Sequence, residues 1–217
     1  MGMAINRYAP LEFRAELGLR AIDHACESLC STIPHDEKYD EYSISALKLL
    51  LPGLLQVKTS PSLEAFTKCQ QGAWNAIKPV SAPVAIQLGA SHAIGHKLGG
   101  IFKVDHGVTS CVMLPAVMKW NSSVNADRQA KVVEVFRETG VARQLEKEGF
   151  EDLGSAGGLL KAYIKFLGMP GSLTEVGVGP DKWDFLAKET MNEPWTHTNP
   201  RKVHGVEDLL EIFELAK

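Results

Sequence analysis

The sequence has little of what marks several classes of protein. Four cysteines among 217 residues are too few for a disulfide framework, so buried free thiols are expected. No apolar run approaches the roughly 18 residues that span a bilayer. The first residues also lack an apolar signal core, which predicts a cytoplasmic protein with no membrane partner. The 23 basic residues are scattered among 26 acidic ones, so nucleic acid is not expected as a partner.

A dinucleotide-binding loop is also missing from the pattern. Gly95, Gly99 and Gly100 fall in or just after a segment with helical spacing, and nothing before them reads as a parallel strand. Long stretches of alternating polar and apolar residues are absent as well, which disfavours a sheet. These absences predict an all-α helical bundle, with residues 1–217 forming a single helical domain and no N-terminal nucleotide-binding domain.

Apolar residues recur at three- and four-residue spacing through most of the chain, as they do in amphipathic helices. Ser60-Pro61 is typical of a helix start, and Pro52-Gly53 is expected to bend or break a helix. Pro115 predicts a kink or a new start, and Gly99-Gly100 is expected to supply the left-handed residue that ends a helix. The predicted helices cover residues 9–31, 41–57, 60–77, 80–98, 108–120, 126–140, 157–167, 181–192 and 206–217.

The stretch from Gly89 to Asn121 holds three of the chain's seven histidines. On a helix, His92 and His96 share one face about one turn apart. The turn after Gly100 can then bring His106 back to them. A histidine pair on a helix is often a packing feature or part of a solvated face, but this stretch is rich in glycine and almost free of charge up to residue 107. We therefore interpret it as a candidate active site.

This stretch resembles a signature of the iron-containing alcohol dehydrogenase family, in particular its maleylacetate-reductase-like branch. Weaker similarity covers residues 18–27, 168–173 and 199–201. The resemblance implies a bundle like the helical C-terminal domain of these enzymes, which is dehydroquinate-synthase-like, without their nucleotide-binding domain. The family's metal ligands are an aspartate, a histidine four residues later and two further histidines. By residue, the three histidine ligands correspond to His24, His92 and His106, and the family's active-site histidine corresponds to His96.

The first ligand position departs from the family pattern, because Arg20 stands four residues before His24. A guanidinium has no lone pair to offer a metal and would repel a nearby divalent ion. Asp23 lies about 100° round the helix from His24, and is not expected to substitute as the ligand. We therefore expect no metal cofactor, and iron or zinc at His24, His92 and His106 would be weakened by Arg20.

The candidate site is compatible with three functions. The favoured hypothesis is a non-redox acid–base enzyme of isomerase, lyase, dehydratase or cyclase type, acting on a small oxygenated or carboxylated substrate. One alternative is an NAD(P)-dependent alcohol dehydrogenase or maleylacetate-reductase-like oxidoreductase that needs a partner nucleotide-binding chain. The other is a non-catalytic binding remnant. In the enzymatic hypothesis the catalytic residues are His24, His92, His96 and His106, and Arg20, Lys97 and Trp195 bind the substrate.

Two further expectations concern the surface. A missing domain would expose a large apolar face, which predicts a homo-oligomer such as a dimer. His35, His197 and His204 lie in polar, loop-like segments and are expected to be solvated.

Overall fold

A computed structural model of the protein describes residues 11–82 and 85–217. Within these ranges the chain forms nine α-helices, two short 3-10 helices and no strand, so the all-α prediction is confirmed. None of the described helices is both long and apolar enough to cross a membrane. The elements are α1 (Leu11–Leu29), α2 (Lys38–Thr59), α3 (Leu63–Ile77), α4 (Ala90–Phe102), α5 (His106–Glu138), α6 (Val141–Lys147), α7 (Ala156–Leu167), η1 (Pro180–Lys182), α8 (Trp183–Thr190), η2 (Pro194–Thr196) and α9 (Val206–Leu215).

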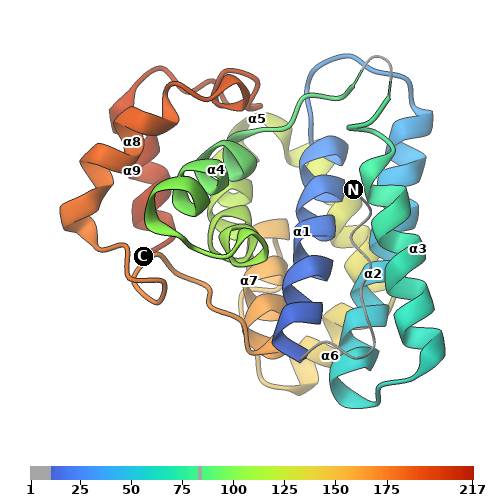
Figure 1. Ribbon diagram of the computed structural model, residues 1–217. Helices are drawn as coiled ribbons and strands as arrows, with labels where there is room; N and C mark the ends of the chain where they lie inside the picture. The colour runs from blue at the N-terminus through green and yellow to red at the C-terminus, as the bar shows by residue number, and fades with distance from the viewer. Residues whose placement is uncertain (1–10, 83–84) are drawn as a thin grey trace.

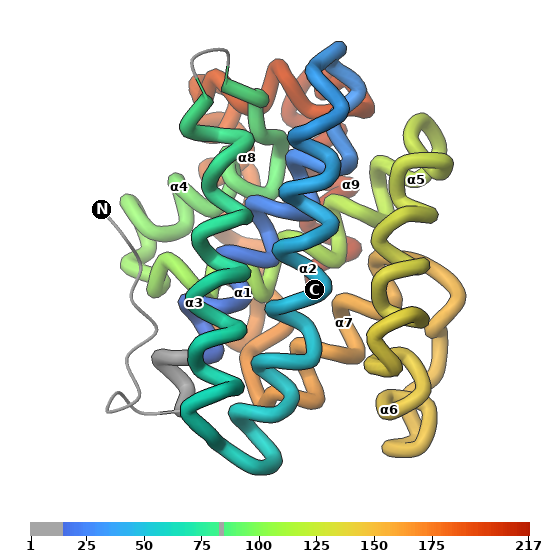
Figure 2. Tube along the Cα trace, turned by 90° about the vertical axis from the view of Figure 1, so that its right-hand side faces the viewer, coloured from blue at the N-terminus to red at the C-terminus, as the bar shows by residue number. Residues whose placement is uncertain are grey.

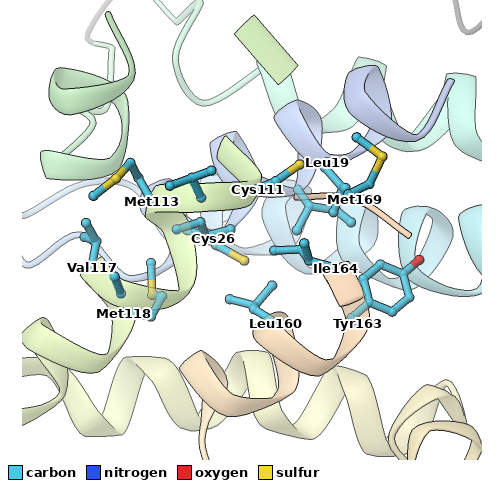
Figure 3. Close-up of a cluster of buried hydrophobic side chains, with 14 of the residues drawn as sticks. Leu19, Cys26, Cys111, Met113, Val117, Met118, Leu160, Tyr163, Ile164 and Met169 are labelled. Carbon is cyan, nitrogen blue, oxygen red and sulfur yellow. The ribbon is translucent and has the colours of Figure 1, made fainter. Parts of the chain in front are cut away.

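Helix α1 lies at the centre of the bundle and contacts α2, α3, α4 and α5 (Figure 1). Figure 2 shows α2 and α3 side by side on one outer face, with α8 and α9 on the far side. Leu19 and Ile22 are almost completely buried, because apolar residues recur along α1 at helical spacing. Figure 3 shows Leu19 and Cys26 of α1 among the sulfur-containing side chains of α5 and the apolar side chains of α7. The central position of α1 gives its polar residues a buried environment.

The prolines inside α2 and α5 do not break their helices. Helix α2 continues through Pro52, and α5 continues through Pro115. In both places a glycine lets a neighbouring helix approach closely: a Cβ on Gly53 would lie 2.8 Å from Cys69 Sγ of α3, and one on Gly157 would lie 2.8 Å from the Pro115 carbonyl oxygen. Close packing against the neighbouring helix therefore compensates for the hydrogen bond that each proline removes. The helix break expected at Pro52-Gly53 and the new helix start expected near Pro115 were wrong, and the kink in α5 lies at Asn125.

Several predicted boundaries also differ from the structure. Helix α3 begins after Ser62, whose hydroxyl accepts a hydrogen bond from the Ala65 N–H, and not at Ser60. Residues 85–89, which precede α4, form no helix although the spacing predicted one, and Ile86 and Leu88 are buried there. Helix α4 passes through Gly99-Gly100, and its left-handed end residue is Lys103, with φ 60°.

The region after the candidate site consists of two helical segments that meet at a kink, close to the predicted gap between residues 120 and 126. Helix α5 spans both segments and contains a single non-helical residue, Asn125, whose side chain donates a hydrogen bond to the Cys30 carbonyl at 2.8 Å. Helix α6 was not predicted, and the predicted start of α1 at residues 9–10 lies outside the described residues. All four cysteines are buried free thiols, as expected.

Candidate active site

Four polar residues form one stripe along the central helix α1. Arg20, Asp23, His24 and Glu27 follow the spacing of a single helical face. Asp23 is fully buried, Arg20 and Glu27 are nearly so, and His24 is partly exposed. Sequence reasoning proposed Arg20 and His24 but missed Asp23 as a member of the site, and it missed Glu27 altogether. The sequence did contain a pattern that could have indicated both residues, because polar residues at this spacing inside an apolar helix are unusual.

Glu27 holds the N-terminus of α4 in place. Its carboxylate accepts hydrogen bonds from the N–H of Gly89 at 3.0 Å and of Ser91 at 2.9 Å. The Asn199 side-chain oxygen accepts the Ala90 N–H at 3.1 Å. Gly89 precedes α4 and has no side chain to cap it, so acceptors from distant parts of the chain satisfy these first N–H groups. This arrangement fixes the helix that carries His92 and His96.

We expect Gly89→Ala to destabilise the protein. A Cβ at this position would lie 2.8 Å from Asn199 Oδ1 and 2.9 Å from Glu27 Oε1, so both capping groups must move. The expected loss is roughly 1 to 3 kcal/mol, the usual range for overpacking a well-packed site. Urea unfolding measures it. Gly100→Ala in the same helix is the matched control: nothing lies within 4 Å of its added Cβ, so it should be neutral or stabilising. Equal stability of the two variants would contradict the prediction.

His92 is fully buried and is anchored on one side only. Its Nδ1 lies 2.7 Å from Glu27 Oε2 and 3.5 Å from Asp23 Oδ2. Burial favours the neutral ring, but Asp23 and Glu27 together raise the pKa of His92. Burial likewise opposes ionisation of Asp23, yet His92 and then Arg20 lower the pKa of Asp23 to about 2. Within the described chain, His92 Nε2 is buried without a hydrogen-bond partner.

Arg20 lies where α1, α4 and α5 meet. Its Nη1 donates a hydrogen bond to Ser110 Oγ of α5 at 3.3 Å and lies 3.8 Å from Asp23 Oδ2. A Cβ on Gly95 of α4 would be 4.0 Å from the same nitrogen. Burial lowers the pKa of Arg20, which Asp23 and Glu27 partly offset, but a guanidinium remains charged in proteins. The site therefore contains a permanent buried cation.

The solvent-facing edge of the site is formed by His96, His106 and Trp195. The rings of His96 and His106 are stacked with centroids 5.9 Å apart, and Trp195 of η2 lies 4.9 Å from His96 and 5.8 Å from His92. Glu193 places Oε2 3.3 Å from His96 Nδ1 and Oε1 3.2 Å from Lys97 Nζ. Glu193 was also missed, because it is close to this edge only in the folded chain. The turn from α4 to α5 brings His106 to His96, as predicted.

His106 is expected to bind a proton only in acid. Partial burial, followed by the charge of Arg20, lowers the pKa of His106 from 6.5 to about 4. Since the unfolded chain then binds more protons than the folded one between these values, the contribution of this ring to stability falls as the pH drops from 6.5 towards 4. An NMR titration, with the ring signal assigned from a His106→Gln variant, measures the pKa. It should rise in Arg20→Ala and stay low in Arg20→Lys, and a wild-type value at or above 6.5 would contradict the prediction.

The three histidines that the resemblance implies as metal ligands are not assembled as a metal site. His24 and His92 are adjacent, with ring centroids 4.5 Å apart, but His106 pairs with His96. In the described part of the chain, the three donors that gather within 4.8 Å of one another belong to Asp23, Glu27 and His92. Glu27 is already occupied by two backbone N–H groups and by His92. These residues do not fit the iron that the resemblance implies.

His35 is not solvated as predicted. Its Nε2 lies 2.9 Å from Asp40 Oδ1 and its Nδ1 lies 2.7 Å from the Ile33 carbonyl oxygen. Arg128 and Lys131 of α5 also contact Asp40, at 2.6 and 2.8 Å. These contacts join the first turn of α2 to α5 and hold His35 of the preceding loop against Asp40, so the polar sequence around His35 reflects a structural cluster. His197 and His204 are exposed, as predicted.

Comparison with known proteins identifies the family. Residues 14–216 match the Fe-containing alcohol dehydrogenase family, C-terminal. The chain belongs to this family. It is 31% identical to Dehydrogenase FUM7 of Gibberella moniliformis over 216 residues, covering 88% of this chain and 48% of that protein. It is 25% identical to the NADPH-dependent butanol dehydrogenase of Clostridium saccharobutylicum, covering 94% of this chain and 51% of that protein.

The structure of this chain is also similar to solved structures of the family. The structure of maleylacetate reductase from Rhizobium sp. strain MTP-10005 superposes with a TM-score of 0.79 at 23% identity, covering 96% of this chain and 53% of that one. The chain therefore spans about half the length of the relatives it matches. The predicted resemblance and the helical C-terminal fold are confirmed.

The favoured hypothesis about the reaction was wrong. These relatives are dehydrogenases and a reductase, which are redox enzymes, and not isomerases, lyases, dehydratases or cyclases. The error arose because a histidine cluster handles protons in both kinds of chemistry, and the absence of a nucleotide-binding loop was taken to favour non-redox chemistry over an oxidoreductase that needs a partner chain. The comparisons support the oxidoreductase alternative.

Proposed function

We propose that this chain supplies the helical half of an NAD(P)-dependent oxidoreductase that interconverts an alcohol and its carbonyl compound. The observation that carries the proposal is the match to dehydrogenases along nearly the whole chain, which includes all four histidines of the site. The nicotinamide nucleotide would be bound outside these 217 residues, by another segment or a partner chain. When bound, it supplies or accepts the hydride.

The geometry of the site supports this assignment. His24 and His92 lie on the inner side, whereas His96, half-buried, and His106, exposed, lie at the edge that is open to solvent. A substrate bound at this edge can contact both a histidine of this chain and a nucleotide that is bound by another segment or a partner chain. The residues of the chain then need only to orient the substrate and to move its proton.

His96 is the group best placed for the proton. Its Nδ1 faces the Glu193 carboxylate, which favours the tautomer with the proton on Nδ1 and leaves Nε2 to exchange a proton with the substrate oxygen. Trp195 covers His96 and His92 and limits the access of water. Lys97 is held by Glu193, so we propose that it orients this carboxylate as well as the substrate.

The proposal is tested by joining this chain to a nucleotide-binding half from a relative. The chain is fused behind the amino-terminal half of the Clostridium saccharobutylicum butanol dehydrogenase, and NADPH binding reports whether the fusion has assembled. Butanal-dependent oxidation of NADPH is then expected in the fusion and in neither half alone. A fusion that binds NADPH but reduces neither butanal nor maleylacetate would overturn the proposal.

A further inference from the structure

The position of Arg20 leads to an inference about the cation of this site. We propose that the Arg20 guanidinium takes the place of the divalent metal, so that the histidines are organised around a cation that is covalently part of α1. The inference concerns the composition of the site and not its reaction. It can therefore be tested whether or not the oxidoreductase proposal holds.

The first argument is placement. Arg20 is one helical turn before His24, and its side chain is 5% exposed. It contacts Asp23 on its own helix and Ser110 on α5, and its Nη1 lies beside Gly95 of α4, 4.0 Å from where a Cβ would stand. A positive charge is thus held at the junction of the three helices that carry the four histidines.

The second argument is the position of Arg20 relative to His24 and His106. Arg20 stands four residues before His24 on α1 and donates a hydrogen bond to Ser110, four residues after His106 on α5. Those two rings come from α1 and α5 and lie in different histidine pairs. The Arg20 guanidinium therefore joins the two helices that carry these rings.

The third argument is charge balance. Asp23 and Glu27 are the two carboxylates against Arg20 and His92, and their oxygens face these groups and the amides before α4. The positive charge of Arg20 would repel a divalent cation placed beside it, and solvent would not screen this repulsion in a buried site. Glu27 could bind that ion only by releasing the two N–H groups that it caps. The negative charges of the cluster are therefore balanced by Arg20 and His92 and not by a metal ion.

The experiment measures zinc and not turnover. Wild type, Arg20→Lys, Arg20→Asp and the double variant Arg20→Asp/His24→Ala are each incubated with Zn²⁺, dialysed and analysed for bound metal by elemental analysis. Arg20→Asp restores a carboxylate one turn before His24 and is expected to retain about one zinc per chain, the stoichiometry of a single four-ligand site. Wild type and Arg20→Lys should retain far less. The double variant should lose the zinc again, because a ligand is missing.

Thermal unfolding gives a second readout. Zn²⁺ should raise the melting temperature of Arg20→Asp, EDTA should reverse the change, and neither should affect wild type or Arg20→Lys. Stoichiometric zinc in wild type that is lost on His24→Ala would overturn the proposal. A folded Arg20→Asp that takes up no zinc would overturn it as well. If Arg20→Asp does not fold, the zinc content of wild type and Arg20→Lys decides: low values support the proposal and stoichiometric values overturn it.

Discussion

Turnover of the fusion with the butanol dehydrogenase half is expected to fall by roughly 10²- to 10⁴-fold when His96 is replaced by alanine, the usual range for loss of a general acid–base group. His96 lies at the open edge of the site, with its Nδ1 facing Glu193 and its ring against Trp195 and His106. Its removal takes away the proton donor but leaves the buried cluster intact. The loss should therefore appear in kcat, with NADPH binding and the melting temperature little changed.

The matched controls for this prediction are a distant histidine and a neighbouring carboxylate. His204→Ala changes an exposed loop histidine and should leave turnover unaffected. Glu193→Gln keeps the shape of the group facing Nδ1 but removes its charge, so it should lower kcat by less than His96→Ala and shift the pH profile. If His96→Ala retains wild-type kcat in the fusion, the proton is handled elsewhere and the role of His96 is disproved.

The largest loss of stability is expected for Glu27→Ala. This change removes the acceptor for the Gly89 and Ser91 N–H groups and the partner of His92, all in a buried environment. Removing one member of a buried ion pair typically costs roughly 3 to 5 kcal/mol, because the other charge is left uncompensated. The unfolding free energy should fall by about this amount, because water cannot reach the buried His92 ring to replace the lost carboxylate.

Chemical denaturation followed by circular dichroism measures the effect of Glu27→Ala. Glu134→Ala, on the exposed face of α5, is the control and should change stability by no more than about 0.5 kcal/mol. Glu27→Gln should fall between the two, because its amide oxygen still accepts from one N–H group. A Glu27→Ala protein as stable as the Glu134→Ala protein would show that α4 is not held by this carboxylate.

The helical spacing of the sequence was sufficient for the fold class and for most elements. It was also sufficient to place His92 and His96 on one helix and His106 after the turn that follows it. Both are local properties, since side chains three and four residues apart must share a face of a helix. The same spacing placed Asp23 and Glu27 beside Arg20 and His24, although their role required a partner from another helix. The motif also indicated the family, which the comparisons confirm.

The tertiary structure decided what local spacing does not encode. Whether Pro52 breaks α2 depends on how closely α3 can approach at Gly53, and where α4 begins depends on acceptors 62 and 109 residues away, in Glu27 and Asn199. The amino-acid sequence by itself determined which residues share a helical face. Burial, charge pairing and capping by residues remote along the chain determined which of those faces became the site, because these terms arise only when the helices pack together.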